Sequence, residues 1–166
     1  MAHQLVLELQ FAREKWFSGH ADLSNEDAKK QFGDANSIGW MVGHLAWFEQ
    51  LTWIEISQGK TVSEMLHAFD WNNGASVPDL DEVLTAWEEV TAVSDEYLNQ
   101  ITEDDLGTTL YRGEYSMGNI GTMLRRQIWH YWYHLGEMQA LRQVMEHKNQ
   151  PPFIGPMSRS VTYGAD

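Results

Sequence analysis

The segment 119–147 predicts one long helix, and any fold for this chain has to be arranged around it. Either Ser116 or Asn119 can cap the free amides at its start. Pro151 and Pro152 forbid its continuation, because proline lacks the amide hydrogen and clashes with the preceding turn. The end of the chain is therefore a long helix followed by a tail.

Three earlier segments also have apolar residues at helical spacing. They run from about residue 2 to 17, 37 to 57 and 79 to 101. Four helices joined by one long connection and shorter loops are typical of a four-helix bundle. The sequence therefore predicts an all-α fold, a four-helix bundle with a long crossover connection (residues 60–78) between its second and third helices.

The other connections are shorter. Residues 22–27 predict a polar connection or a helical turn, and residues 108–116 predict a small extended turn or hairpin around Arg112 and Gly113. A chain of 166 residues is most simply one domain. We expect residues 1–147 to form the bundle, and residues 148–166 to be a tail that packs on it or extends from it.

The formal net charge of −13 is unevenly distributed. Between Thr61 and Tyr111 the chain has twelve carboxylates and no lysine or arginine. Such a surface repels phosphate backbones and anionic lipid, so we expect no nucleic-acid partner. No stretch approaches the roughly 18 uninterrupted apolar residues of a membrane span, and the N-terminus lacks the pattern of a signal peptide. We expect a cytoplasmic protein with no membrane partner.

The chain contains no cysteine. Disulfides, thiolate metal sites and cysteine nucleophiles are therefore excluded. Any metal ligand must offer nitrogen or oxygen, and any thiol chemistry requires a thiol that arrives as a substrate.

His130 and His134 lie four residues apart, which puts both imidazoles on one helix face about a turn apart. Two nitrogen ligands at this spacing can reach one divalent metal ion. His44 shares a face of the second helix with Trp40 and Trp47, so it would complete a three-histidine site if the two helices pack side by side. The competing interpretation is that these histidines are ordinary packed residues.

Two other metal motifs are incomplete. Glu64 and His67 match one Glu-x-x-His element of a di-iron bundle, but the chain has no second one. The His-Glu-x-x-His pattern of zinc proteases requires a glutamate where this chain has Tyr131. Neither type of site is predicted.

Two segments together resemble signatures of the DinB-like family. Ile38-Gly-Trp-Met-Val-Gly-His-Leu-Ala-Trp-Phe-Glu is similar to the family's second-helix signature. His130-Tyr-Trp-Tyr-His-Leu-Gly-Glu-Met-Gln is similar to its last-helix signature, in which two histidines precede a glycine. The resemblance covers about residues 5–144 and implies a four-helix bundle of metalloenzymes, often homodimeric, whose metal ligands would be His44, His130 and His134. Members of the wider superfamily include transferases and isomerases that use low-molecular-weight thiols such as bacillithiol or mycothiol.

Glu137 departs from the resembled pattern, because many relatives carry glutamine at this position after the glycine. An additional carboxylate there has three possible roles: a fourth metal ligand, a general base, or an acceptor that orients an imidazole. The preceding glycine, Gly136, is expected to remove a side chain next to the site.

Three neutral histidines leave the charge of a divalent ion uncompensated and some of its coordination positions open, as in catalytic sites. Imidazole ligands suit zinc or nickel, and also iron or copper. The resemblance favours a metal-dependent S-transferase that uses a small thiol on a small-molecule substrate. The alternatives are a metal-dependent hydrolase with Glu137 as its catalytic base, and a non-catalytic, stress-related metal-binding dimer.

The residues expected around a substrate are aromatic or basic. Those that could wall an apolar pocket, or simply pack in the core, are Trp40, Trp47, Trp129 and Trp132. Arg126, with Arg125, could bind a thiol that carries a carboxylate, or could be solvated at the surface. Tyr111 and Tyr115 could overhang the site from the loop before the last helix.

Overall fold

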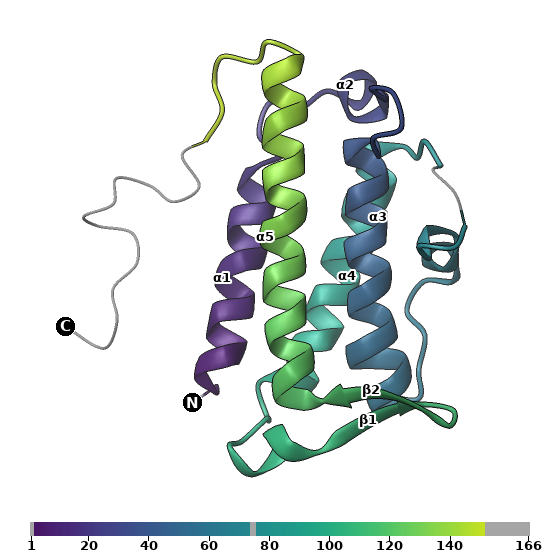
Figure 1. Ribbon diagram of the computed structural model, residues 1–166, viewed down its shortest axis with the longest axis vertical. Coiled ribbons are helices and arrows are strands. Elements are labelled where there is room, and N and C mark those ends of the chain that lie inside the picture. The colour runs from purple at the N-terminus through teal and green to yellow at the C-terminus, as the bar shows by residue number, and fades with distance from the viewer. Residues whose placement is uncertain (1, 74–75, 152–166) are drawn as a thin grey trace, which may run out of the picture.

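Four long helices, α1 (Gln4–Ser18), α3 (Ile38–Glu49), α4 (Leu80–Leu98) and α5 (Ile120–Val144), lie side by side and form the body of the fold (Figure 1). The computed structural model describes residues 2–73 and 76–151. Helix α1 packs against α5, α3 packs against α4, and α3 also contacts α5. The predicted mostly helical class is confirmed, and the part of the predicted tail beyond residue 151 lies outside the described residues.

Side-chain caps explain where these helices begin. Ser37 accepts a hydrogen bond from the amide of Trp40, and Asn119 accepts one from the amide of Thr122. Each cap satisfies an amide that has no partner within its own helix. Of the two predicted caps for the last helix, Asn119 is the one that the structure uses, because it directly precedes the first helical residue, Ile120, whereas Ser116 lies earlier in the strand.

The second predicted helix, residues 37–57, continues beyond the end of α3, because its last two turns are not wound as an α-helix. Residues Gln50–Ile56 form a π-helix, η1, directly after Glu49. Here the side chains of Ser57 and Gln58 donate hydrogen bonds to the carbonyls of Thr52 and Trp53, five residues earlier. Apolar spacing predicts a helix but does not distinguish an α-helix from a π-helix over so short a segment.

Short elements connect the long helices. They are α2 (Asn25–Lys29), the 3₁₀ helices η2 (Glu64–Phe69) and η3 (Asp104–Gly107), and the strands β1 (Thr109–Arg112) and β2 (Tyr115–Asn119). The two strands form an antiparallel hairpin, with a register irregularity between Leu110 and Tyr111. Its turn contains Gly113 at φ +62°, a conformation that favours glycine. The hairpin predicted at this position is therefore present, and it lies across the lower ends of α3 and α5 (Figure 1).

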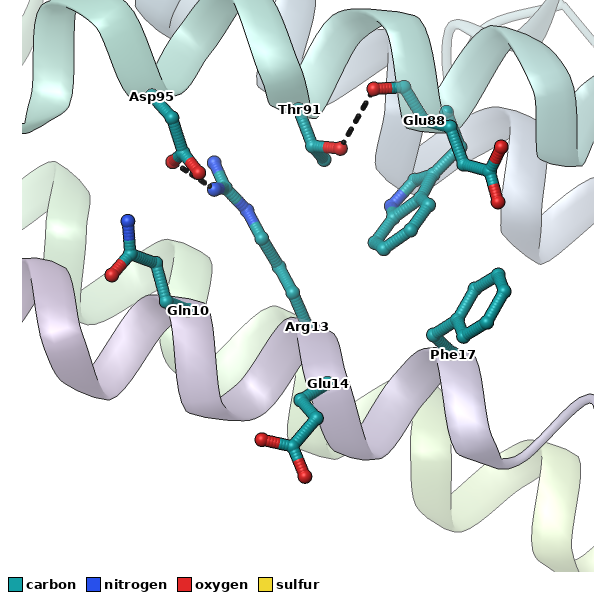
Figure 2. Close-up of a pocket in the computed structure, with 8 residues that line it drawn as sticks. Gln10, Arg13, Glu14, Phe17, Glu88, Thr91 and Asp95 are labelled. Atoms are coloured by element: carbon teal, nitrogen blue, oxygen red, sulfur yellow. Dashed lines mark hydrogen bonds and ion pairs between the residues drawn. The ribbon is translucent and has the colours of Figure 1, made fainter.

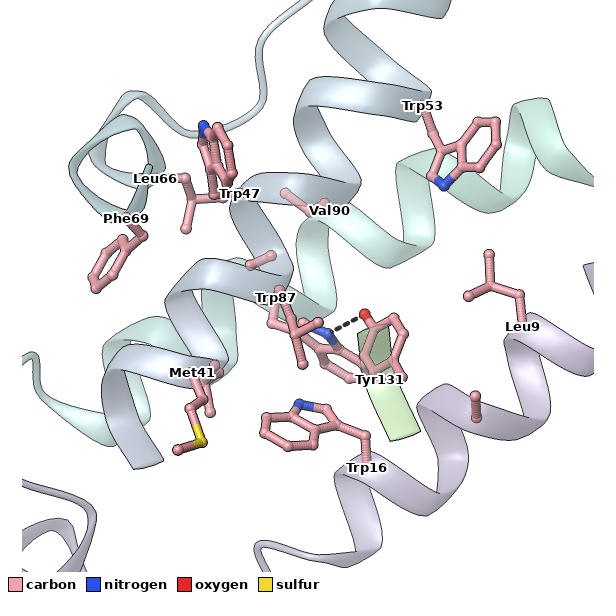
Figure 3. Packing of buried hydrophobic residues seen from close by; sticks show 14 of the residues in the cluster. Leu9, Trp16, Met41, Trp47, Trp53, Leu66, Phe69, Trp87, Val90 and Tyr131 are labelled. Atoms are coloured by element: carbon pink, nitrogen blue, oxygen red, sulfur yellow. Dashed lines mark hydrogen bonds between the residues drawn. The ribbon is translucent and has the colours of Figure 1, made fainter. Parts of the chain in front are cut away.

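Large aromatic and aliphatic side chains fill the space between the helices (Figure 3). Trp16 and Trp53 are fully buried, and Trp87 is nearly so. On α4, Ser94 is fully buried, whereas the adjacent Val93 is only partly buried. Among the helices that the structure describes, no helix is long and apolar enough to cross a lipid bilayer.

Candidate metal centre

Helices α3 and α5 bring three histidines together where they face each other. His44 comes from α3, and His130 and His134 come from successive turns of α5. One ring nitrogen from each lies within 4.8 Å of the other two. The ring centroid of His44 lies 5.0 Å from that of His130 and 5.5 Å from that of His134. The packing condition that the sequence left open, α3 beside α5, is therefore met.

The orientation of His44 is fixed from three sides. Its Nδ1–H donates a hydrogen bond of 2.9 Å to the backbone carbonyl of Phe69. Because a carbonyl only accepts, Nδ1 carries the proton and Nε2 keeps a free lone pair. Trp40 stacks on one side of the imidazole, with ring centroids 4.5 Å apart, and Trp47 stacks less closely at 5.5 Å. The ring therefore has one tautomer and one plane before any ligand binds.

His134 is oriented in the same manner by a carboxylate. Its Nδ1–H donates to Glu137 Oε2 at 2.6 Å, which leaves its Nε2 as the free nitrogen. The Nε2 atoms of His130 and His134 then face each other at 3.0 Å. Two imidazole nitrogens at this distance require a proton or another cation between their lone pairs. The arrangement suits a cation that accepts several nitrogen donors.

Burial keeps the imidazoles of His44 and His130 uncharged at neutral pH. It lowers the pKa of His44 to about 4. Burial also lowers the pKa of His130 to about 2, with the nearby His134, His44 and Arg126 as further causes. Neutral imidazoles have the lone pairs that metal coordination requires. The donor set, its protonation and its hydrogen-bond partners all fit a divalent transition metal held by three histidines.

Glu137 lies beside the three histidines and bonds to one of them. Burial raises the pKa of the Glu137 carboxyl, but the hydrogen bonds from His134 and Tyr133, together with the charge interactions with His134 and His44, outweigh burial and hold this pKa below its usual value. Glu137 in turn raises the pKa of the Tyr133 hydroxyl by its negative charge and by a hydrogen bond. Of the three roles considered for Glu137, the acceptor that orients an imidazole is the one that this geometry supports.

A cavity of about 740 Å³ opens next to the histidines. Helix α5 contributes Arg126, Trp129, His130 and Tyr133, and the remaining walls come from α3, η1, the hairpin and Trp71. The cavity residues on α3 and η1 are His44, Trp47, Phe48 and Leu51, and those on the hairpin are Arg112, Tyr115 and Met117. His44 and His130 are thus accessible to a molecule of substantial size, whereas the buried His134 is outside the described lining.

Some of the predicted substrate residues line this cavity and others do not. Trp47, Trp129, Arg126 and Tyr115 belong to its lining, whereas Arg125 does not. Three other predicted residues are also outside the described lining: Trp40, which stacks on His44, Trp132, which packs near Phe11, and Tyr111.

Gly136 does not make room for the site, contrary to the prediction. A Cβ atom at this position would meet no atom within 4 Å. The glycine with a spatial role is Gly43, where a Cβ atom would lie only 2.5 Å from the ring of Phe69. Because Gly43 lets η2 approach α3 this closely, the Phe69 carbonyl reaches His44. A glycine inside a helix, which costs about 1 kcal/mol relative to alanine, was the available sequence signal for this contact.

A second, smaller cavity of about 340 Å³ lies between α1 and α4 (Figure 2). Arg13 extends across it from α1 and donates a hydrogen bond of 2.6 Å to Asp95. Its other nitrogens donate to both carboxylate oxygens of the buried Glu49, at 2.7 and 2.6 Å. These partners outweigh the opposing effect of burial and raise the pKa of Arg13. The arginine is thus fully paired inside the protein.

The same carboxylate connects to α5. The Tyr131 hydroxyl donates to Glu49 Oε1 at 2.9 Å, and the Trp87 indole N–H donates to the Tyr131 oxygen at 2.8 Å (Figure 3). Burial and the charge of Glu49 raise the pKa of Tyr131 well above its usual value. Because Tyr131 adjoins His130, this network fixes the rotation of α5 that directs His130 away from the core and into the first cavity.

A family model described as the DinB superfamily matches residues 8–138 of the chain. The chain belongs to the DinB superfamily. The match includes all three histidines and Glu137. It extends from α1 into α5, and so contains both helices that form the candidate metal centre. No curated protein is similar enough to this chain to count as a match.

Proposed function

We propose that this DinB superfamily protein is a metal-dependent S-transferase. His44, His130 and His134 would hold one divalent transition metal ion, with zinc or nickel the first candidates and iron or copper the next. A low-molecular-weight thiol would be the nucleophile, because the chain has no cysteine of its own. The observation that carries the proposal is the convergence of three imidazoles whose nitrogens lie within 4.8 Å of one another, two of them, His44 and His130, at the wall of a cavity.

The chemistry of the transfer is simple in outline. When bound, a divalent metal ion lowers the pKa of a thiol that it coordinates, so that thiolate forms near neutral pH. The thiol loses its proton to solvent and its sulfur forms a bond to an electrophilic carbon. The leaving group departs with the electron pair of the bond that breaks. The chain itself has to bind both reactants and keep its three imidazoles oriented.

Several residues perform that orienting role. The Phe69 carbonyl and Glu137 hold the Nδ1 protons of His44 and His134, so both rings direct Nε2 toward the shared site. Trp47 is part of the cavity wall and also stacks on His44, so a substrate that packs on Trp47 lies next to the donor atoms. We propose that Trp40, which stacks on His44 outside the described cavity lining, helps to hold that imidazole in place. Arg126, which lines the cavity, is proposed to contact the substrate.

Thiol consumption by the metal-loaded protein is the direct test. We expect metal-loaded protein to consume a small thiol in the presence of a model aryl halide, and His130→Ala to abolish this activity. His147→Ala is the matched control, since His147 pairs with Asp27 away from the site. Equal turnover by His130→Ala and the unmodified chain, with both correctly folded, would remove the proposal.

The hydrolase alternative assigns Glu137 as the general base. That role is less favoured because its carboxylate is already bonded to His134 and does not line the described cavity. Glu137→Gln separates the two proposals. If Glu137 orients His134, the variant should weaken metal affinity by about tenfold while turnover still requires a thiol. Hydrolysis without a thiol, lost in the variant, would favour the hydrolase instead.

The non-catalytic alternative also makes a measurable prediction. When the free metal concentration is a hundred times the dissociation constant, binding stabilises the folded protein by about 2.7 kcal/mol. A rise in melting temperature with zinc or nickel, but no turnover with any thiol, would support a protein that only binds metal.

We further propose that α1, α3, α4 and α5 form a four-helix bundle with a crossover through η2, and that the protein is a cytoplasmic homodimer. Sedimentation in solution tests the dimer.

A further inference from the structure

The cavity beside the histidines differs in charge from the chain as a whole. The sequence has 24 acidic and 11 basic residues. The described lining of this cavity nevertheless includes Arg112 and Arg126 and no carboxylate. The two arginines come from separate elements, β1 and α5, so the tertiary fold brings them to the same cavity.

Neither arginine is neutralised by a side chain in the part of the chain that the structure describes. Within residues 2–73 and 76–151, no ion pair or side-chain hydrogen bond involves Arg112 or Arg126. Arg13, in the other cavity, shows the opposite arrangement, since two carboxylates surround it. The positive charge of Arg126 also extends to the histidines, because it is one of the causes that lower the pKa of His130.

Most of the remaining cavity lining is aromatic, and several of its rings are largely exposed. Trp71 is 72% exposed, Tyr115 is 71% exposed and Trp129 is 64% exposed, although each is a large side chain with an apolar surface. Ligand sites in proteins combine such apolar walls with a small number of placed polar groups. Here the placed groups are two cationic guanidinium forks, which match the geometry of an oxyanion.

We propose that this cavity binds a small organic acid, with its apolar body among the aromatic side chains and its carboxylate on Arg112 and Arg126. The inference deepens the proposed function and rests on it in one respect: it makes one of the two reactants of the transfer a carboxylic acid. The charge of a metal ion held by neutral histidines would add to the attraction for this anion.

A matched pair of probes tests the proposal without measuring turnover. The probes are 2-naphthoate and 2-naphthamide, which share an aromatic body and differ in charge. Chemical-shift titration of the full-length, ¹⁵N-labelled protein gives both dissociation constants, and the indole N–H signals of Trp47 and Trp129 report binding in this cavity. We expect naphthoate to bind about tenfold more tightly than naphthamide, the difference that one charge-assisted hydrogen bond supplies.

The variants Arg112→Gln and Arg126→Gln should each reduce this preference several-fold and leave naphthamide binding unchanged. Arg125→Gln is the matched control, because it removes the same charge from the adjacent residue, which is exposed and outside the cavity lining. The titrations are made in chelator and again after zinc loading. The titrations in chelator decide whether the arginines bind the carboxylate. In the zinc-loaded protein, naphthoate could also bind the metal ion directly.

Three outcomes would overturn the inference: equal binding of the two probes, no binding of either, or a preference that survives in the Arg112→Gln, Arg126→Gln double variant. Failure of the proposed function has a different signature. A protein that prefers naphthoate through these arginines, but consumes no thiol when loaded with metal, keeps the organic-acid site and loses the transferase. A protein that transfers thiols but does not prefer naphthoate keeps the transferase and loses the organic-acid site.

Discussion

At the scale of single residues, the candidate centre depends on groups that coordinate nothing themselves. The Phe69 carbonyl and the Glu137 carboxylate select which nitrogen of His44 and His134 carries the proton. Such partners orient metal ligands, and their loss typically costs about 10- to 100-fold in metal affinity. Gly43 belongs with these residues, because its missing side chain allows Phe69 to come close.

Two glycine-to-alanine variants separate this positioning effect from helix propensity. Gly43→Ala places a methyl group against the Phe69 ring, so we expect a loss of stability of about 1–3 kcal/mol from overpacking. The shift of η2 should also weaken zinc binding by about tenfold, as loss of a ligand's hydrogen-bond partner does. Competition with a chromophoric chelator measures the affinity.

Gly136→Ala is the control, because its new methyl group meets nothing within 4 Å. It should leave zinc affinity unchanged and stabilise the protein by up to about 1 kcal/mol through better helix propensity. If both variants changed zinc affinity equally, the close approach of Phe69 would not be what orients His44.

At the scale of elements, the connection between α3 and α4 is part of the candidate centre. The buried side chain of Gln50 attaches it to η1: Gln50 Oε1 accepts from the amides of Val62 and Ser63, and its Nε2 donates to the Ser63 carbonyl. Gln50 is fully buried. The attachment precedes η2 directly, so it also sets the position of Phe69.

Gln50→Leu should release this connection. Backbone groups that lose a buried partner cost about 1–3 kcal/mol each, so we expect a loss of stability of about 3 kcal/mol. Hydrogen exchange at the amides of Val62 and Ser63 should become faster than at the core of α5. Gln100→Leu, a substitution of an exposed glutamine after α4, should change neither quantity. Unchanged exchange at residues 62 and 63 would mean that other contacts hold the connection.

At the scale of the whole molecule, one buried network joins the four long helices. Glu49 of α3 accepts from both Arg13 of α1 and Tyr131 of α5. On α4, Asp95 accepts from Arg13, and Trp87 donates to the Tyr131 oxygen. Breaking a buried ion pair by removing one partner costs about 3–5 kcal/mol, because the other charge remains buried.

Arg13→Met should therefore destabilise the protein by about 3–5 kcal/mol in chemical denaturation. Adding Glu49→Gln should recover about half of this loss, since the remaining group is then neutral. A double variant whose loss equals the sum of the two single losses would show that the pair is not coupled. Zinc affinity in the double variant reports whether the network also holds His130 in place.

The whole molecule should also become less stable in mild acid. His20 is buried next to Trp16, and burial lowers its pKa to about 4 from an unfolded value of 6.5. Between these values the unfolded chain binds a proton that the folded chain does not. Stability from this group is complete above about pH 6.5 and is lost as the pH falls toward 4, about 3 kcal/mol in total.

Chemical denaturation at a series of pH values measures this effect. The comparison is between the unmodified chain and His20→Phe, both in chelator, so that the other histidines contribute equally to both. The slope of unfolding free energy against pH should be smaller in the variant between pH 6.5 and 4. Identical slopes would show that His20 is accessible to protons in the folded protein.

The sequence alone determined the helical class, the hairpin at Arg112 and Gly113, and the candidate ligands. These are local properties, because apolar spacing, caps and the interval between His130 and His134 are all read within one element. The resemblance to DinB signatures also came from short segments, and the family match over residues 8–138 confirms it. The same local reasoning could not detect the π winding of η1, and it assigned a steric role to the wrong glycine.

Only the tertiary structure decided what surrounds the histidines. The Phe69 carbonyl lies 25 residues from His44, and Arg112 joins Arg126 from another element, so no spacing along the chain indicates either contact. Contacts of this kind depend on how helices pack and how a connection folds back over them. A sequence therefore identifies the donor atoms of a site more readily than it identifies the partners that orient them or the charge of the cavity beside them.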